Sequence, residues 1–440
     1  MLQAFAQYNL SSPAVWVDQR AISYQELFNE VNKVALELTK QGILPGHRVA
    51  FIANIQIHSI VLFLALLEIQ ATPCLLSPRL PLEQIPEYLQ KAQASFYTDP
   101  HSLISQKRET ISLQNSGEIL LFTSGSSGTP KLAVLKPQHF LENAAGSVEQ
   151  LGLLKKPGCW LLSVPLFHVS GLSILFRCLQ TASAIALPSD FSRENITHLS
   201  WVPTQLFRQL DAKTLFPNLR CALIGGAPIG ASLLQKAQEA NLPLFLTYGM
   251  TEMASQITMT SNEDTLLPLH LGKALPGREI RFSQEGEILV RGACLFTGYD
   301  TEQGIYKPLI EGSWFPTGDL GCVDLNGNLH HKGRKDHLFI SGGENIYPEA
   351  IERALGTLPN VLHAIVVPQE DVEFGQRPVA FVHIQGDMPS KEEFHEKLSS
   401  LLPRFSLPVQ FLPLPQEEIT KSLKWTRSSL TQKLQKIRRS

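Results

Sequence analysis

"LLFTSGSSGTPKLAVL", residues 120–135, joins two apolar segments through a run of Ser, Thr, Gly and Pro that ends at one lysine. Glycines let backbone N–H groups turn inward, hydroxyl groups donate hydrogen bonds, and a lysine neutralises negative charge. These properties suit a loop that holds a chain of phosphates. The same composition is also typical of a flexible Ser/Gly linker, so the stretch alone supports both interpretations.

The loop does not have the Walker A pattern, which requires Gly-Lys followed by Ser or Thr. Here Lys131 follows Pro130 and precedes Leu132. A phosphate-binding role therefore requires another kind of loop.

Strand-like and helix-like segments alternate on the N-terminal side of the loop. Ser23-Tyr-Gln-Glu26 is a capping box, and the residues after it have helical spacing. Residues 48–54 are typical of a strand, and an apolar helix is expected at about 60–69. This alternation predicts an α/β fold with a mainly parallel sheet.

Three further apolar strands each run into a turn that contains Gly or Pro. They are "GCWLLSVPLFH" (158–168), "LRCALIGGAP" (219–228) and "PLFLTYGMTE" (243–252). Ligands of open α/β sheets bind at such strand ends, so we expect a binding site there.

The pattern changes after about residue 280. "GEILVRG" (286–292) alternates apolar and polar residues, and "GCVDLNGNLHHKGRKD" (321–336) contains an Asn-Gly turn, so both predict hairpins. From about 337 the pattern predicts a small α/β unit. The last twenty residues hold seven basic and no acidic residues, which predicts a solvated helical tail, with a role for its charge as the alternative.

The composition sets the broad class of protein. With 440 residues, 43% of them hydrophobic and 18% charged, the chain is expected to be globular with more than one domain. A net charge of −2 does not favour nucleic acid as a partner. The six cysteines show no zinc-like spacing and are expected to be reduced thiols. The longest apolar run has eight residues and no secretory signal is visible, so we expect a cytoplasmic protein without stable membrane insertion.

Five motifs occur in the order typical of one superfamily. They are "TSGSSGTPK" (123–131), "YGMTE" (248–252), "TGDL" (317–320), "GRKD" (333–336) and "SGGENIYPEAIE" (341–352). Over nearly its whole length the chain resembles the adenylate-forming enzymes: acyl-CoA synthetases, luciferases and nonribosomal-peptide adenylation domains. The resemblance implies a large N-terminal α/β domain that binds ATP and the acid (1–335). It also implies a small, mobile α+β cap domain that carries a catalytic lysine (336–440).

The resemblance also implies nucleotide-binding residues. They are Thr123, Ser124, Gly125, Ser126, Ser127, Gly128, Thr129, Lys131, Gly226, Ala227, Pro228, Tyr248, Gly249, Asp319 and Arg334. Tyr248 would stack on adenine, while Asp319 would accept hydrogen bonds from the ribose hydroxyls with Arg334 beside them. Thr251 would contact the α-phosphate and Glu252 would bind Mg²⁺, which prefers hard oxygen ligands. Taken singly, these residue types are equally compatible with core packing, a helix N-terminal charge or a turn.

The catalytic lysine is expected in "SLKWTRSS" (422–429). Lys424 and Arg427 keep the family's lysine–arginine spacing, although Leu423 stands where the family has glycine. Lys421 is the competing candidate, but it has no arginine at the same offset.

The second half-reaction of the family uses rotation of the small domain. Asp336 matches the hinge residue, although an Asx turn is the alternative interpretation. Gly342 and Gly343 would then line the tunnel for the pantetheine arm of coenzyme A.

"SVPLFHVSGLSILFR" (163–177) carries information about the acid. His168 matches a catalytic and substrate-binding position at the mouth of the acyl pocket, with a structural histidine as the alternative. Arg177 interrupts an apolar segment, where a guanidinium needs an anionic partner. It could reach a helix end, pair with a core carboxylate, or bind a substrate that carries a second carboxylate.

Several segments together resemble the o-succinylbenzoate–CoA ligases of menaquinone biosynthesis. They are "PLFHVSG" (165–171), "HLSWVPTQL" (198–206), Ser255-Gln256, "LPGREI" (275–280) and "EFGQRPVAF" (373–381). In that family, residues at the positions of Arg177 and Ser200 help to bind the substrate. Ser200 is equally compatible with a plain hydroxyl at a strand end.

The predicted reaction converts an acid and ATP to acyl-AMP and pyrophosphate, and then acyl-AMP and coenzyme A to acyl-CoA and AMP. The expected ligands are o-succinylbenzoate, ATP, Mg²⁺ and coenzyme A, and a homo-oligomer is left open. Alternatives are a ligase for another aromatic or medium-chain acid, a stand-alone adenylation domain that loads a carrier protein, and a non-catalytic relative. An amino-acid substrate is disfavoured because no aspartate lies near residue 200.

Overall fold

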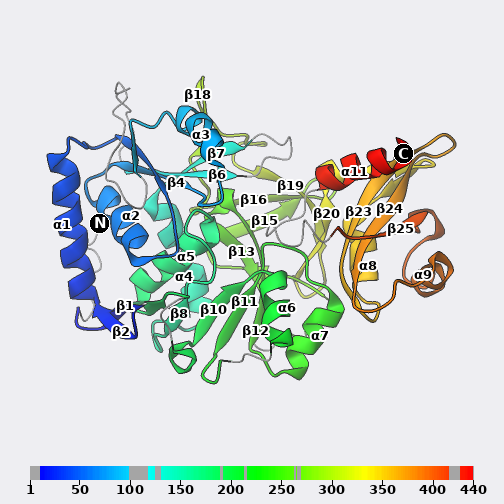
Figure 1. The fold of residues 1–440 in the computed structure, drawn as a ribbon, viewed down its shortest axis with the longest axis horizontal. Coiled ribbons are helices and arrows are strands. Elements are labelled where there is room, and N and C mark those ends of the chain that lie inside the picture. The colour runs from blue at the N-terminus through cyan, green and yellow to red at the C-terminus, as the bar shows by residue number, and fades with distance from the viewer. Residues whose placement is uncertain are drawn as a thin grey trace.

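The computed structural model describes residues 10–98, 117–123, 130–188, 192–212, 216–261, 264, 269–415 and 427–439. Within these residues the strands form four sheets (Figure 1). Three sheets belong to the N-terminal part, and the fourth is built from strands after residue 338. This mixed α/β architecture, with a larger N-terminal part and a smaller C-terminal part, agrees with the predicted fold class. The boundary between residues 335 and 336 stays a prediction.

The largest sheet has nine strands, of which the central six run parallel. In spatial order they are β14 (Lys273–Ala274), β13 (Ser255–Met259), β12 (Leu244–Met250), β11 (Cys221–Ile224), β10 (His198–Trp201), β8 (Cys159–Leu161), β9 (Ala184–Ala186), β1 (Pro13–Val17) and β2 (Arg20–Ser23). The three predicted apolar strands are β8, β11 and β12. Their carboxyl ends therefore lie at the same edge of this sheet.

A second sheet has seven strands. In spatial order they are β18 (Gly304–Tyr306), β17 (Gly298–Thr301), β7 (Lys131–Leu135), β6 (Ile119–Thr123), β4 (Thr72–Leu76), β3 (Arg48–Ile52) and β5 (Phe96–Thr98). Strands β6, β4, β3 and β5 run parallel, whereas β7, β17 and β18 are added antiparallel. This sheet is therefore mixed and not mainly parallel as expected, because β7 runs antiparallel to β6.

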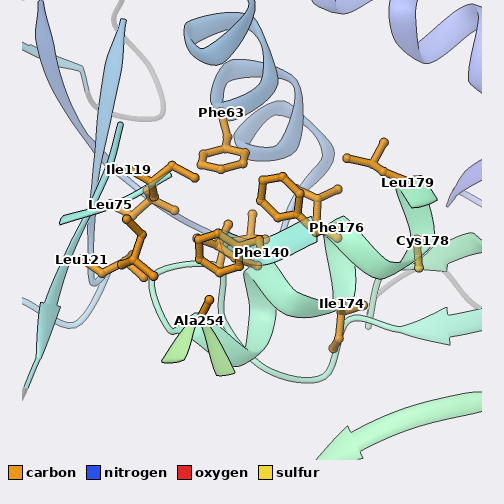
Figure 2. Packing of buried hydrophobic residues seen from close by; sticks show 14 of the residues in the cluster. Phe63, Leu75, Ile119, Leu121, Phe140, Ile174, Phe176, Cys178, Leu179 and Ala254 are labelled. Atoms are coloured by element: carbon orange, nitrogen blue, oxygen red, sulfur yellow. The ribbon is translucent and has the colours of Figure 1, made fainter. Parts of the chain in front are cut away.

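Helices between the two sheets form the main core. They include α2 (Ile57–Glu68), α4 (Pro137–Gln150) and α5 (Val169–Thr181), and each contributes one phenylalanine to the cluster in Figure 2. Phe140 and Phe176 stack at 4.9 Å between ring centroids, and Phe63 meets Phe176 edge-on at 6.2 Å. The cluster also contains buried residues of both sheets, so one apolar layer holds the two sheets in place.

The predicted capping box is confirmed at the start of α1 (Tyr24–Lys40). The Ser23 hydroxyl accepts a hydrogen bond from the Glu26 N–H at 3.2 Å, and the Glu26 carboxylate accepts one from the Ser23 N–H at 2.8 Å. The predicted apolar helix is α2, and the strand at 48–54 is β3. Further helical segments of the N-terminal part are α3 (Ile85–Lys91), α6 (Pro203–Asp211), α7 (Ala231–Glu239), η2 (Leu82–Gln84), η3 (Arg193–Asn195) and η4 (Thr251–Met253).

The predicted hairpins form a four-stranded antiparallel sheet. Its strands are β15 (Arg278–Phe282), β16 (Glu287–Gly292), β19 (Phe315–Val323) and β20 (Leu329–Arg334). A short 3₁₀ segment, η5 (Lys335–His337), leads from β20 into the C-terminal part.

The C-terminal sheet is covered on both faces (Figure 1). It contains β22 (Glu344–Ile346), β21 (Phe339–Ser341), β24 (Gly375–Ile384), β23 (Val361–Asp371) and β25 (Gln410–Pro413). Helices α8 (Pro348–Leu355) and α9 (Lys391–Leu398) pack on one face, and α11 (Arg427–Arg439) packs on the other. The remaining short helix is η6 (Arg404–Ser406).

The prediction of a solvated tail is wrong for one face of α11. Leu430 and Leu434 are 0% and 3% exposed and pack against β23 and β24. Their i, i+4 spacing puts both leucines on one side of the helix.

In the described part of the chain, no helix is long and apolar enough to span a bilayer.

Candidate active site

The predicted phosphate loop closes a β-hairpin. Strands β6 and β7 are antiparallel, and Thr123 is the register partner of Lys131. A strand follows the loop here, whereas a helix follows a Walker A loop. The predicted phosphate-binding residues Ser124, Gly125, Ser126, Ser127, Gly128 and Thr129 lie outside the described residues.

Tyr299 joins the lysine of this hairpin to the predicted magnesium ligand. The Lys131 ammonium lies 5.0 Å from the centroid of the Tyr299 ring, and the Tyr299 hydroxyl donates a 2.5 Å hydrogen bond to Glu252. Burial, together with the negative charge of Glu252, raises the pKa of Tyr299, so the phenol stays protonated as the donor. Sequence reasoning missed Tyr299, because its role depends on β17 pairing with β7.

Glu252 fits a magnesium ion that is shared with a nucleotide. It is 8% exposed and lies in η4, directly after β12. Among the described residues, no group of three or more His, Cys, Asp or Glu side chains could form a metal cage. Mg²⁺ usually binds one or two carboxylates and completes its coordination with phosphates and water. One carboxylate, joined through Tyr299 to the lysine predicted to bind phosphate, meets that requirement.

Three predicted nucleotide-binding residues, Tyr248 for adenine and Asp319 and Arg334 for the ribose, come together from three strands. The Tyr248 hydroxyl of β12 donates to Asp319 of β19 at 2.7 Å, and Arg334 of β20 donates to Asp319 at 3.2 Å. His331, which sequence reasoning missed, lies 3.5 Å from the same carboxylate. Burial alone would raise the pKa of Asp319, but His331, Arg334 and Tyr248 lower it below its ordinary value. Asp319 is therefore held ionised as a hydrogen-bond acceptor.

At two positions near the carboxyl ends of β11 and β12, the backbone geometry explains why the residue is glycine. Gly226 has φ +76° in the exposed turn Gly226-Ala227-Pro228, which follows β11 beside the end of β12. A Cβ on Gly249 would lie 2.0 Å from the Ser255 carbonyl oxygen, so only glycine fits at position 249.

Arg334 also binds the predicted hinge residue. Its guanidinium donates to both carboxylate oxygens of Asp336, at 3.0 and 3.3 Å. One arginine thus links Asp319 in the antiparallel sheet to η5, where the C-terminal part begins. The adjacent Lys335 forms a 2.6 Å ion pair with Glu285.

The predicted coenzyme A loop is the turn between β21 and β22. Gly342 and Gly343 have φ +59° and +87°, the values of a tight hairpin turn. The Gly342 N–H donates to the Phe374 carbonyl oxygen at 2.9 Å, and a Cβ on Gly342 would lie 2.8 Å from the Phe374 ring. The candidate lysines Lys421 and Lys424 lie outside the described residues, as does Leu423.

Arg177 is buried without a protein carboxylate among the described residues. It is 1% exposed, and its guanidinium donates to the hydroxyls of Ser147 and Ser173 at 3.0 and 2.9 Å. It also donates to the side-chain oxygen of Gln256 at 2.8 Å and lies 4.4 Å from the Trp160 ring. Its Nη1 atom has no hydrogen-bond partner in the same described ranges.

Two of the three interpretations of Arg177 are therefore wrong for the described residues. The side chain does not extend to solvent at a helix end, and no described carboxylate lies within ion-pair distance. Burial lowers the pKa of Arg177 to about 10, which still leaves it charged at neutral pH. An anionic ligand remains the third interpretation. Sequence reasoning missed the neutral partners of Arg177, because they come from separate helices and strands.

The other two predicted acid-binding residues lie at strand and helix ends. His168 is exposed as the residue before α5, with its ring 4.3 Å from that of Phe167. Ser200 is half-buried in β10, and its carbonyl oxygen accepts a hydrogen bond from Ser163.

Comparison with known proteins places the chain in a family. The model of the AMP-binding enzyme family matches residues 2–118 and 106–300. The chain belongs to this family. It is 33% identical over 446 residues to a 2-succinylbenzoate–CoA ligase of Salmonella typhimurium, with 97% of this chain and 96% of that protein covered. A second enzyme of that name, from Bacillus cereus, is 32% identical over 88% of this chain and 89% of its own length.

Solved structures agree with the sequence comparison. A single-substitution variant of Escherichia coli MenE with bound OSB-AMS superposes with a TM-score of 0.85 at 30% identity, over 98% of this chain and 97% of that one. Bacillus subtilis MenE in complex with ATP and magnesium ion has a TM-score of 0.82 at 27% identity, over 94% and 95% of the two chains. The resemblance to adenylate-forming enzymes and the predicted fold class are confirmed.

Proposed function

We propose that the chain is an ATP-dependent o-succinylbenzoate–CoA ligase of menaquinone biosynthesis, acting through an acyl-adenylate. The curated relatives carry the name 2-succinylbenzoate–CoA ligase, and the neighbouring MenE structures hold ATP with magnesium, AMP, or the acyl-adenylate OSB-AMP. The activity of those proteins is the first support for the proposal. The second is the arrangement of this chain's own residues.

In the first half-reaction, a carboxylate oxygen of the acid attacks the α-phosphorus of ATP, and the bond to pyrophosphate breaks. The hairpin loop between Thr123 and Lys131 would hold the phosphates, and Asp319 would accept the ribose hydroxyls. Glu252 would hold Mg²⁺, which neutralises phosphate charge when it is bound. Lys424 would stabilise the negative charge that gathers between the carboxylate and the α-phosphate.

In the second half-reaction, the thiol of coenzyme A attacks the acyl carbon and AMP leaves. We propose that the small domain turns about Asp336 between the two half-reactions. The tight turn Gly342-Gly343 would then line the path of the pantetheine arm. The breaking of the Arg334–Asp336 ion pair is the local change that such a rotation requires.

One observation carries the choice of acid: the buried charge of Arg177. Every described protein group that binds this guanidinium is neutral, and Nη1 has no partner among the described residues. The second carboxylate of o-succinylbenzoate would supply the missing anion through a charge-assisted hydrogen bond. His168 directly precedes α5, nine residues before Arg177, which corresponds to about 13.5 Å along the helix axis at 1.5 Å per residue. The two residues would therefore serve opposite ends of the acid, with Ser200 beside it.

Release of pyrophosphate tests the proposal directly. The purified enzyme is mixed with ATP, Mg²⁺ and one acid at a time, and thioester is measured after coenzyme A is added. We expect o-succinylbenzoate to give the highest kcat/KM for both products. A higher value for benzoate, a medium-chain acid or an amino acid would establish one of the alternative substrates. Absence of pyrophosphate with every acid would support a non-catalytic relative.

A further inference from the structure

Arg427, the first residue of α11, is the centre of a charge cluster in the C-terminal part. Its guanidinium donates to both carboxylate oxygens of Glu352, at 2.6 and 2.7 Å, and lies 3.1 Å from a carboxylate oxygen of Glu349. It also lies 3.0 Å from Nδ1 of His337 and 3.3 Å from the Val366 carbonyl oxygen. The arginine therefore binds α8 and β23, and it lies beside His337 of η5, whose Nδ1 contacts Glu349.

Two of these contacts reach the junction between the domains. His337 directly follows the hinge residue Asp336 and forms a 2.6 Å contact with Glu349. Glu349 in turn packs against Gly333 of β20, where an added Cβ would lie 2.5 Å from its Oε2 atom. The glycine of the "GRKD" motif thus leaves room for this carboxylate. Arg427 is linked through Glu349 to the last strand of the large domain.

The position of Arg427 on its helix is unfavourable unless it serves such contacts. A cation at a helix N-terminus opposes the helix dipole. The helix is already held on the sheet by Leu430 and Leu434, both of which are buried. The docking of α11 therefore does not depend on Arg427 alone. What the arginine adds is a defined position for the first residue of the helix.

Lys424 precedes Arg427 by three residues in the sequence. We propose that Arg427 is a positioning residue for acyl-AMP formation, which anchors the lysine-bearing segment to Glu349 and Glu352, beside the hinge-side His337. The inference rests on the proposed function, in which Lys424 acts in the first half-reaction alone. Removal of the anchor should then impair acyl-AMP formation and spare thioester formation.

Separate assays of the two half-reactions test this role. Arg427→Ala should lower kcat for pyrophosphate release about 10- to 100-fold, with KM for ATP and the acid changed less than about 3-fold. Conversion of supplied acyl-AMP and coenzyme A to thioester should stay within about 3-fold of the wild type. Glu352→Gln, which can still accept the Val366 N–H bond, should give a smaller loss in the same direction. Arg427→Lys keeps the positive charge but loses the planar guanidinium with its several donors. Its rate of pyrophosphate release should therefore lie between those of the wild type and Arg427→Ala.

Arg404→Ala is the matched control, because it removes an exposed guanidinium from the same domain. It should leave both half-reactions unchanged. Equal loss of both half-reactions in Arg427→Ala and Glu352→Gln, or no loss in either, would overturn the positioning role. If the wild type releases no pyrophosphate with o-succinylbenzoate, the proposed function has failed, and the anchor is tested by proteolysis. Endoproteinase Lys-C should then cleave after Lys421 and Lys424 several-fold faster in Arg427→Ala than in Arg404→Ala, and equal rates would refute the anchor.

Discussion

Arg177 and Arg427 are two helical arginines with opposite surroundings. Arg427 is bound by two carboxylates of its own domain, whereas Arg177 is bound by two hydroxyls, one amide oxygen and an indole ring. The buried Arg48 likewise has a protein carboxylate, that of Asp300. Burying a charge is costly unless it is paired, so the protein has satisfied Arg427 and Arg48 by itself. The charge of Arg177 has no such carboxylate among the described residues.

Arg278 shows that neutral partners alone do not identify a ligand site. It is 6% exposed, and each of its three guanidinium nitrogens donates to a backbone carbonyl oxygen. Arg177 differs because one of its terminal nitrogens has no partner among the described residues. The comparison therefore separates arginines whose terminal nitrogens are satisfied by the fold from Arg177, whose Nη1, unpartnered within the described ranges, supports the proposed contact with the acid.

The largest effect is expected for Lys424, the residue that Arg427 is proposed to position. Lys424→Ala should lower the rate of acyl-AMP formation by on the order of 10² or more, because it removes the group that we propose stabilises transition-state charge. It should still convert supplied acyl-AMP and coenzyme A to thioester. Rapid-quench assays of each half-reaction measure both rates. The same loss in Lys421→Ala alone would move the catalytic role to that lysine.

The hinge should show the opposite division between the half-reactions. Asp336→Pro fixes φ near −65° and should slow thioester formation at least about tenfold, with pyrophosphate exchange retained. Asp336→Ala is the control, since it removes the ion pair with Arg334 and leaves the backbone free to rotate. Normal turnover in the proline variant would show that the pivot lies elsewhere.

A carboxylate placed beside Arg177 should make it resemble Arg427. Gln256→Glu puts a negative charge about 2.8 Å from the guanidinium, in competition with the acid. We expect KM for o-succinylbenzoate to rise roughly tenfold, which corresponds to a charge-assisted contact of ~1.4 kcal/mol. Ser147→Ala removes a neutral partner and adds no charge, so its KM should change less than about 3-fold. An unchanged KM in Gln256→Glu would remove the acid from this site.

The smallest expected effect concerns Tyr299. Tyr299→Phe keeps the ring over Lys131 and removes the hydroxyl that donates to Glu252. The loss of one hydrogen bond of ~0.5–1.5 kcal/mol should lower the rate of acyl-AMP formation about 2- to 10-fold. A magnesium titration should show a matching change in the concentration needed for half-maximal rate. Tyr306→Phe, on the adjacent strand and 59% exposed, is the control that should behave like the wild type.

Local patterns in the sequence predicted many elements of the fold but not the partners of the strands. Two local motifs could be predicted because all their residues lie close together in the sequence. They are the capping box at Ser23 and the Asn326-Gly327 turn. The pairing of β7 with β17 joins residues more than 160 positions apart, and nothing in either strand specifies the other. The assignment of strands to the two main sheets was therefore not predicted.

The same limit applies to the site. Motifs predicted Tyr248, Asp319 and Arg334, and the structure brings these three residues together. Tyr299 and Gln256 act through contacts with distant elements, and their sequence context carries no signal for those contacts. For Arg177 the sequence raised the question of a partner, and only the packing of α5 excluded a described protein carboxylate.

The most direct test of the comparison is the selectivity of Arg177→Ala for the second carboxylate of the substrate. The measured quantity is kcat/KM for o-succinylbenzoate divided by kcat/KM for an analogue whose aromatic carboxylate is replaced by hydrogen. For the wild type we expect a ratio of roughly 10 to 100, from a contact of ~1.5–3 kcal/mol. In Arg177→Ala the ratio should fall to about 1, because the analogue is no poorer a substrate for the variant than for the wild type. A ratio that stays at the wild-type value, with both substrates weakened equally, would show that Arg177 completes the fold and does not bind the acid.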